Sequence, residues 1–428
     1  MEKFFKLKEH GTTVKVEIMA GITTFMTMAY ILAVNPGILS AAGMPAGGVF
    51  TATALSAMIA TVVMALISNL PIALAPGMGL NAFFAFTVVL TMGYSWQLAL
   101  TAVFVEGIIF ILMSLLNIRE AIIKSIPKNI KSAVSVGIGL FIAFIGLQNA
   151  GIIINNDATL VSLGDITQGK ALLALIGLVV MGVLLAFKVK GALLIGIIAT
   201  TVIGIPFGVT TIPQSWSPFS APAAPLLFQF DFSKLFSLDF FVVLFTFLFV
   251  DIFDTIGTLV GVTTQAGLIK PNGEIPKVKQ ALLADAIGTV AGACLGTSTV
   301  TSYVESASGV AEGGRTGLTS LTTGILFGLA LFLSPLFLLV PGAATAPALI
   351  LVGLFMLSPV KDIDLTDFTE SVPAFLTIIM MPLAYSIAEG LVFGILAYIL
   401  LKALTGKFKD ISIVTWVVGG FFILKHLL

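Results

Sequence analysis

The sequence predicts an all-α polytopic membrane protein with 14 transmembrane spans, arranged as two inverted repeats of seven spans. Three observations support this prediction: the composition, the spacing of apolar segments, and a motif that recurs after half the chain. Of the 428 residues, 58% are hydrophobic and 10% are charged, whereas about a quarter of a soluble domain is charged. A mean hydropathy of +1.13 leaves too few polar residues to cover a globule of this size.

The charges and the few reactive side chains exclude several kinds of protein. The 21 basic and 21 acidic residues balance, so we expect no basic surface for nucleic acid. The single cysteine, Cys294, excludes an intramolecular disulfide and a metal site built on several thiolates. His10 and His426 lie near the chain ends, so carboxylates are the best candidates for handling protons within the membrane, and a tyrosine is the alternative. We therefore expect no cofactor and no bound metal.

Apolar segments of about 20 residues, the length that crosses a bilayer, follow one another along the chain. Between Lys15 and Arg119 there is no basic residue, and Pro36, Pro71 and Gly93 divide this stretch into four spans. Three more spans complete the first half, and seven follow in the second half. The predicted spans are 15–35, 49–68, 72–91, 97–117, 131–149, 171–187, 191–209, 238–261, 280–295, 297–311, 317–340, 344–358, 372–386 and 388–403.

Cations are distributed unequally between the two sides of this layout. Loops on one side hold 18 Lys and Arg residues, and loops on the other side hold only Lys170 and Lys234. The positive-inside rule places the basic side, with the N-terminus, in the cytoplasm of a cell-membrane protein. The first apolar run has no cleavage motif, so no signal peptide is expected. The terminal segment 411–427 suits either a fifteenth span or a surface helix.

A motif recurs at an offset of half the chain. The pattern Pro-x11-Gly-Leu-Phe begins at Pro127 and again at Pro341, 214 residues later. Since each copy has seven spans, an odd number, the two copies enter the membrane in opposite directions, as in many secondary transporters with alternating access. Chance similarity within a structural bundle is the alternative. The predicted units are a first repeat at 1–209, a connecting loop at 210–234, a second repeat at 235–405 and a C-terminal apolar segment at 406–428.

The third and tenth spans cannot be continuous helices. Span 3 has two prolines and two glycines between Pro71 and Gly79, so a helix can start only near Asn81. Span 10 begins with β-prone residues at 297–303 and becomes helical after Glu305. We predict that both spans are half unwound, with short β segments. Unwound backbone in corresponding places of two halves indicates a binding site at the membrane midplane, whereas close helix packing would explain the glycines alone.

Carboxylates within the spans are the candidate functional groups, because an unpaired charge at this depth is costly. Asp251, Asp254, Thr255 and Thr258 share one face of span 8. Asp254 and Glu305 lie on spans that form the predicted site, so we expect them to bind substrate and to carry a proton. No Lys or Arg is expected within the spans. The full set of predicted substrate-binding residues is Asp254, Glu305, Asn81, Thr255, Thr258 and Ser306, and the roles of Glu106, Asp251, Asp285 and Glu389 stay open.

Several motifs together resemble the AzgA-like purine permeases of the nucleobase-ascorbate transporter superfamily. They are 29–36, 76–81, the Asp-Thr-Ile-Gly-Thr string at 254–258, and 299–315, and the resemblance runs from about Lys6 to Thr405. It implies a core domain, about 15–117 and 238–340, and a gate domain, about 131–209 and 344–403. It also implies proton-coupled uptake of adenine, guanine and hypoxanthine.

The resemblance also assigns three site residues. Asp254 matches the family's span 8 substrate acid, Glu305 its span 10 acid, and Asn81 its span 3 polar residue. The expected partners are a purine base, protons and membrane lipid, and the sequence leaves open whether the protein forms a homodimer. Purines present N–H and amino donors, which carboxylates and an amide can bind.

Three other functions fit the composition less well. An anion carrier of the same architecture would need a positive site, and the acids in both site-forming spans, Asp254 in span 8 and Glu305 in span 10, oppose it. A membrane-embedded hydrolase lacks a metal-binding or paired-acid motif, and a channel lacks a symmetric filter. We therefore expect a transporter and no enzyme activity.

Overall fold

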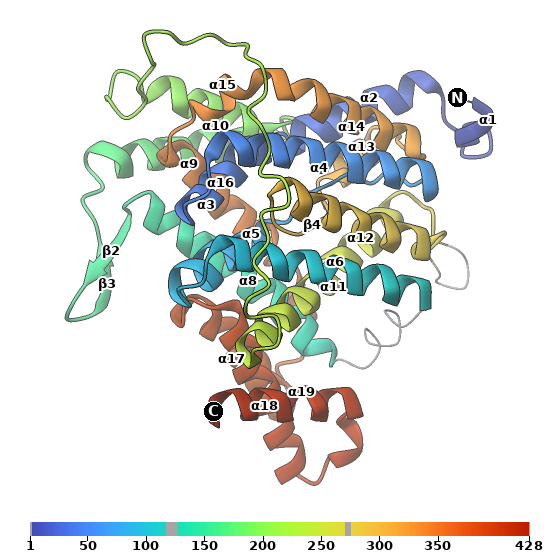
Figure 1. Cartoon of the computed structure of the whole chain (residues 1–428), viewed down its shortest axis with the longest axis vertical. Coiled ribbons are helices and arrows are strands. Elements are labelled where there is room, and N and C mark those ends of the chain that lie inside the picture. Colours follow the sequence, from blue (N-terminus) through green and yellow to red (C-terminus); the bar gives the residue numbers. More distant parts are fainter. Residues whose placement is uncertain (1, 117–126, 270–274, 428) are drawn as a thin grey trace.

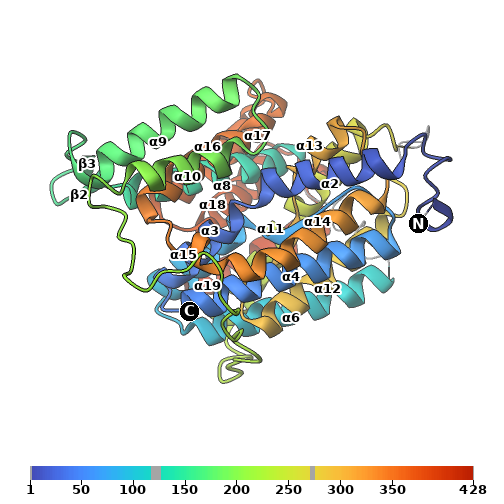
Figure 2. The same cartoon turned by 90° about the horizontal axis from the view of Figure 1, so that it is seen from above.

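The computed structural model describes residues 2–116, 127–269 and 275–427. Within them, nine helices are long and apolar enough to cross a membrane, and three shorter apolar helices accompany them. Figures 1 and 2 show most of these helices running side by side in one bundle, with a hairpin of β2 (Ile153–Asn156) and β3 (Leu160–Leu163) projecting at one end. The chain is therefore a multi-pass membrane protein, as its composition predicts.

The helices follow the predicted spans in order. In the first half they are α1 (Glu2–Phe5), α2 (Val14–Met28), α3 (Ile31–Ala41), α4 (Ala46–Ile67), α5 (Met78–Ala82), the π-helix η1 (Phe83–Thr91), α6 (Trp96–Leu116), α8 (Lys128–Asn149), α9 (Gly169–Ala186) and α10 (Ala192–Ile203). In the second half they are α11 (Leu238–Gln265), α12 (Val278–Leu295), α13 (Ser306–Ala311), α14 (Gly317–Ala330), η2 (Leu331–Leu333), α15 (Ser334–Leu338), α16 (Gly342–Phe355), η3 (Ser358–Asp362), α17 (Phe368–Leu383), α18 (Ile387–Leu404), η4 (Phe408–Asp410) and α19 (Ile413–Leu427).

Two predicted boundaries are wrong. Span 1 continues past Pro36, which lies inside α3, and the chain breaks instead between α2 and α3, at Tyr30. Helix α10 ends at Ile203, six residues before the predicted end of span 7, because the glycine- and proline-containing segment 204–208 forms turns. Span 11 agrees with one apolar stretch, Gly317–Leu338, in which η2 joins α14 to α15 and Pro335 lies in the first turn of α15.

The interruptions of spans 3 and 10 are confirmed as two short strands. Strand β1 (Leu74–Pro76) pairs antiparallel with β4 (Val300–Ser302), with Ala75 opposite Thr301. Beyond the strands, the Gly77 N–H donates to the Thr299 carbonyl at 2.9 Å. Both strands are fully buried, so this pairing supplies the hydrogen bonds that the unwound backbone cannot obtain from lipid.

Helices beside the strands complete their hydrogen bonding. Thr61 of α4 donates its hydroxyl to the Leu74 carbonyl at 3.0 Å, and Thr289 of α12 donates its hydroxyl to the Val300 carbonyl at 2.9 Å. The two threonines therefore make the same contact, each in its own half of the chain. Each strand is held by a helix on its outer side as well as by the other strand.

Helices from the two halves of the chain pack directly against each other. Helix α4 contacts α12, and α8 contacts α16. The glycines of the recurring motif, Gly139 and Gly353, meet at the second of these contacts, where a Cβ atom added to Gly139 would lie 2.7 Å from the Gly353 carbonyl oxygen. Only glycine lets the two backbones approach this closely.

The C-terminal segment is tied to the bundle. Lys402 of α18, which is buried, lies 2.8 Å from Glu370 of α17. Lys407 lies 2.8 Å from Asp367, and this hydrogen bond holds the pKa of Asp367 well below its usual value. Helix α19 then packs against α18 and α11, with the Phe422 ring 5.6 Å from that of Phe245.

We expect Gly139→Ala to destabilise the protein, because the added methyl group would clash with the backbone of α16. Overpacking of this kind costs about 1–3 kcal/mol. Gly182→Ala in α9 is the matched control, since no atom lies within 4 Å of its added Cβ and alanine favours a helix. The apparent melting temperature of the purified protein should fall for Gly139→Ala and stay level or rise for Gly182→Ala. Equal melting temperatures for the two variants would contradict the close contact.

Candidate functional site

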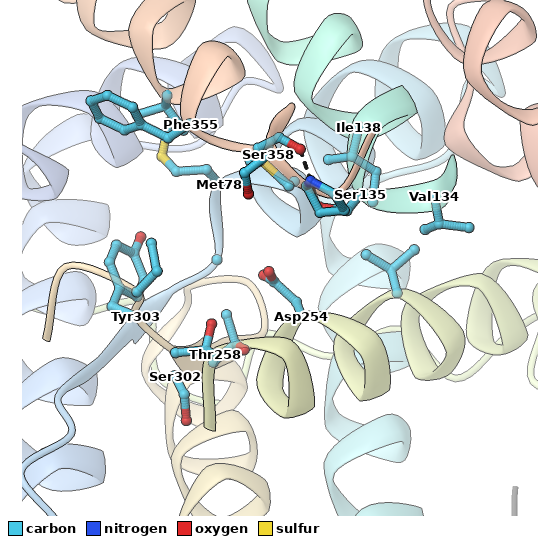
Figure 3. A pocket seen from close by; sticks show the side chains of 18 of the residues that line it. Met78, Val134, Ser135, Ile138, Asp254, Thr258, Ser302, Tyr303, Phe355 and Ser358 are labelled. Atoms are coloured by element: carbon cyan, nitrogen blue, oxygen red, sulfur yellow. Dashed lines mark hydrogen bonds between the residues drawn. The ribbon is translucent and has the colours of Figure 1, made fainter. Parts of the chain in front are cut away.

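A cavity of about 680 Å³ opens where the two interrupted spans meet. One wall comes from the segment joining β1 to α5, the segment joining β4 to α13, and the middle of α11. The opposite wall comes from α8, α16 and the start of η3. Figure 3 shows Asp254, Thr258, Ser302 and Tyr303 on the first wall, facing Ser135 and Phe355 on the second.

Asp254 projects from α11 into this cavity (Figure 3). Gly77 allows the chain to pass close to the carboxylate, since a Cβ atom on Gly77 would lie 3.7 Å from Asp254 Oδ2 and 2.5 Å from the Thr301 methyl group. Thr258, one turn further along α11, also lines the cavity. Asp254 and Thr258 therefore lie where the sequence predicts a substrate contact.

The predicted polar face of α11 divides in two. Thr255 points away from the cavity lining and donates its hydroxyl to Asp285 of α12 at 2.9 Å. The same hydroxyl lies 2.7 Å from the Thr301 hydroxyl in β4 and 3.3 Å from Asp251 Oδ1. Residues three or four apart share a helix face only approximately. Asp254 and Thr258 therefore line the cavity, while Thr255 on the same broad face contacts β4. In this structure Thr255 fastens β4 to α11 and α12.

Glu305 lies at the start of α13 and lines the same cavity. Its Oε1 accepts a hydrogen bond of 2.7 Å from the hydroxyl of Tyr30. Asp254 and Glu305 thus share one cavity, where two ionised carboxylates repel each other unless a proton or a donor group intervenes. The cavity is suited to a ligand that donates hydrogen bonds.

Asn81 and Ser306 lie behind the cavity lining. The Asn81 amide oxygen accepts a hydrogen bond from the Ser298 hydroxyl, and its amide nitrogen donates to the Pro76 carbonyl at 3.3 Å. Ser306 accepts a hydrogen bond of 3.0 Å from the Ala73 N–H. Both side chains connect one interrupted span to the other, so the structure gives them a positioning role, and their direct contact with a substrate stays a prediction.

Two further buried acids support β4. Glu106 of α6 accepts a hydrogen bond of 2.6 Å from the Thr299 hydroxyl, just before the strand. Asp285 reaches the strand through Thr255. Both side chains are fully buried, and neither lines the cavity. Their contacts explain why acids occur at these depths outside the site itself.

Sequence reasoning missed several cavity residues. Tyr30 lies within the segment 29–36, one of those that carry the family resemblance, but its hydroxyl was not expected in the site. The expectation that no basic residue lies within the spans is wrong, because Lys131 belongs to α8 and lines the cavity. Helix α8 starts at Lys128, three residues before the predicted span, and this brings the first-turn lysine inward. The same helix supplies Ser135.

Comparison with known proteins identifies the group to which this chain belongs. Residues 15–393 match the model of the Permease family. The chain is a member of that family. The permease is 44% identical over 431 residues to the adenine permease AdeP of Escherichia coli (strain K12), covering 99% of this chain and 95% of AdeP. It is 48% identical over 422 residues to the guanine/hypoxanthine permease PbuG of Bacillus subtilis (strain 168), covering 96% of each chain.

Solved structures show the same fold at low sequence identity. The permease superimposes on the transmembrane domain of the cyanobacterial bicarbonate transporter BicA with a TM-score of 0.67 and 17% identity, covering 88% of this chain and 97% of that domain. SLC26A9 gives a TM-score of 0.61 at 11% identity, covering 92% of this chain and 66% of SLC26A9. The permease therefore has the fold of a transporter membrane domain.

We expect Asn81→Ala and Ser298→Ala to raise the KM for substrate by similar factors, about twofold to tenfold, because both remove the hydrogen bond between these two side chains, which positions the strand pair. Asn81→Ala loses in addition only the longer bond of 3.3 Å to the Pro76 carbonyl. Concentration-dependent uptake of labelled substrate by each variant, normalised to the amount in the membrane, gives both values. A changed substrate preference in Asn81→Ala alone would contradict the positioning role and would favour the direct contact that the sequence predicts.

Proposed function

We propose that this permease imports purine nucleobases, namely adenine, guanine and hypoxanthine, by proton symport with alternating access. One observation carries the proposal: Asp254 from the continuous helix α11 and Glu305 from the interrupted span 10 line one cavity in a chain that aligns over nearly its full length with adenine and guanine/hypoxanthine permeases. The permease then acts as a carrier and not as an enzyme.

The chemistry of a purine suits this cavity. Its ring N–H and exocyclic amino groups are donors for the carboxyl groups of Asp254 and Glu305. The hydroxyl of Thr258 and the backbone near Gly77 offer further polar contacts. Asn81, Thr255 and Ser306 support binding by fixing the strands. An anion carrier is not favoured, because two carboxyl groups in the cavity repel an anion, and the likeness to BicA concerns the fold alone.

The architecture in this proposal is a 14-span inverted repeat, with repeats at 1–209 and 235–405. The contacts between corresponding elements support it, because β1 pairs with β4, α4 packs on α12 and α8 packs on α16. Equivalent surfaces meet in this way around an approximate two-fold axis. The proposed core domain, about 15–117 and 238–340, and gate domain, about 131–209 and 344–403, then face each other across the cavity.

The cavity in this arrangement opens toward the cytoplasm. Its rim contains Lys131 and Ser358, which lie next to loops assigned to the cytoplasmic side. Further along α8 in the outward direction, the ring of Phe141 packs 5.3 Å from that of Tyr385, and Phe86 packs 6.0 Å from it. Phe86 belongs to the proposed core domain and Tyr385 to the proposed gate domain, so this aromatic contact joins the two domains on the outer side of the proposed site. The N-terminus is then cytoplasmic and the protein lies in the cell membrane.

Proton coupling follows from the cost of moving charge through a medium of low dielectric constant. A site with both carboxyl groups ionised resists passage across the membrane. Protonation of Glu305, or alternatively Asp254, together with a bound base leaves a site that carries less charge. The site that holds a base and a proton can therefore move from facing one side of the membrane to facing the other. The empty, ionised site cannot make this change as readily, because it carries more charge.

Uptake of labelled adenine, guanine and hypoxanthine by cells without their own purine permeases tests the function. We expect the permease to accumulate at least one purine, and a protonophore to abolish accumulation. Asp254→Asn should stay in the membrane and reduce uptake about tenfold or more, since it loses a charge-assisted hydrogen bond to the base. The absence of purine uptake by the unmodified permease would contradict the proposal, and normal uptake by Asp254→Asn would remove Asp254 from the site.

Glu305→Gln should separate binding from coupling, because glutamine mimics the protonated acid permanently. We expect purified Glu305→Gln in proteoliposomes to retain purine counterflow but to lose accumulation driven by an imposed pH gradient. The unmodified protein, assayed in both modes, is the control. Gradient-driven accumulation by Glu305→Gln would place the proton site elsewhere, with Asp254 the next candidate.

A further inference from the structure

The hydroxyl of Tyr30 is the side-chain donor to Glu305. The Tyr30 Oη and Glu305 Oε1 atoms are 2.7 Å apart, and both residues line the cavity. Tyr30 comes from the junction between α2 and α3, whereas Glu305 precedes α13, so the bond joins the two halves of the chain. It was not expected from the sequence, and nothing in the chemistry of purine binding alone requires it.

The structure holds this pair firmly in place. Tyr30 is fully buried and precedes α3, where the chain changes direction. Thr27, one turn earlier, places its hydroxyl 3.5 Å from the backbone carbonyl of Glu305. The end of α2 therefore contacts Glu305 at the side chain and also at the backbone. A tyrosine ring has few rotatable bonds, so a buried ring fixes its hydroxyl precisely.

We infer that Tyr30 is a positioning residue for coupling, whose hydroxyl holds the Glu305 carboxylate and sets the external pH at which the site accepts its proton. The inference rests on the proposed function, in which Glu305 carries the proton. A hydroxyl that donates to a carboxylate stabilises the ionised form more than the protonated form. Tyr30 therefore opposes protonation of the empty site and favours release of the proton after transport.

Other ionisable groups around Glu305 differ from Tyr30 in their contacts. The ionisable side chains that line the same cavity are Asp254 on α11, Lys131 on α8 and Tyr303 after β4. Asp251 and Asp285 lie a layer behind and reach β4 through Thr255. At the far end of α13, the Arg315 side chain donates hydrogen bonds to backbone carbonyls. Glu17 accepts hydrogen bonds from backbone N–H groups of the segment that leads into α14. In this set, Tyr30 is the group that donates a hydrogen bond to the Glu305 carboxylate, whereas Asp254 acts on it as a second negative charge in the same cavity.

Tyr303 provides a matched control in the same cavity. It is also a buried tyrosine, but its hydroxyl donates to the backbone carbonyl of Pro76 at 2.5 Å. Tyr303→Phe therefore removes a hydroxyl from the cavity without removing a donor from a carboxylate. A general effect of losing a tyrosine hydroxyl would appear in both variants, whereas an effect on proton loading should appear in Tyr30→Phe alone.

The test is the dependence of purine uptake on external pH in proteoliposomes that contain the full chain. Loss of the donor makes Glu305 easier to protonate, so uptake by Tyr30→Phe should persist to higher pH, with its midpoint raised by about one pH unit. The midpoint for Tyr303→Phe should match that of the unmodified protein. Adding Tyr30→Phe to Glu305→Gln should leave the pH dependence of purine counterflow unchanged, because glutamine at position 305 cannot titrate.

Glu305→Asp tests the contact without altering the tyrosine. The shorter aspartate side chain withdraws the carboxylate from the Tyr30 hydroxyl. The midpoint of the pH dependence of purine uptake should therefore rise in Glu305→Asp as well. The intrinsic pKa of aspartate is about 0.4 units lower than that of glutamate, so the residue type alone would lower the midpoint.

Two outcomes would overturn the inference, and they are distinguishable. Uptake by the unmodified protein that ignores pH and a protonophore would reject the symport proposal, and this inference with it. If the unmodified protein is proton-coupled but Tyr30→Phe and Glu305→Asp, both present in the membrane and active in counterflow, keep its midpoint, the positioning role alone is rejected.

Discussion

The antiparallel pairing of β1 with β4 joins the two halves of the chain and positions the buried polar side chains behind the cavity. Two stretches of extended backbone lie deep within an apolar bundle, where no lipid can satisfy their N–H and C=O groups. Each strand supplies partners for the other, and Thr61 and Thr289 complete the set from α4 and α12. Neither half of the chain could bury its interrupted span without the other half, so the strand pair makes the two halves one unit.

The placement of the buried polar side chains follows from that pairing. Glu106, Asp285, Thr255 and Ser306 all reach the strands or the segments beside them, and so keep the strand pair at a fixed position behind the cavity. Asp254 is then free to project into the cavity toward α8 and α16. The acids within the membrane thus divide into those that build the site and those that face its contents.

Much of this was predictable from the sequence, because strong local signals mark it. The proline and glycine residues around Pro76 forbid a helix, and the hydroxyl-rich run before Glu305 disfavours one, so both interruptions were predicted. The split of the α11 face was not, because spacing cannot show that Thr255 turns toward Asp285. The inward position of Lys131 was also missed, since a lysine at a helix start usually reaches the membrane surface.

A structure of the protein with bound hypoxanthine would show whether the strand pair presents one purine site to the cavity. We expect the base to occupy the cavity of about 680 Å³, with ring N–H groups within about 3.2 Å of carboxyl oxygens of Asp254 and Glu305. A base bound outside this cavity, or one that contacts neither acid, would contradict it.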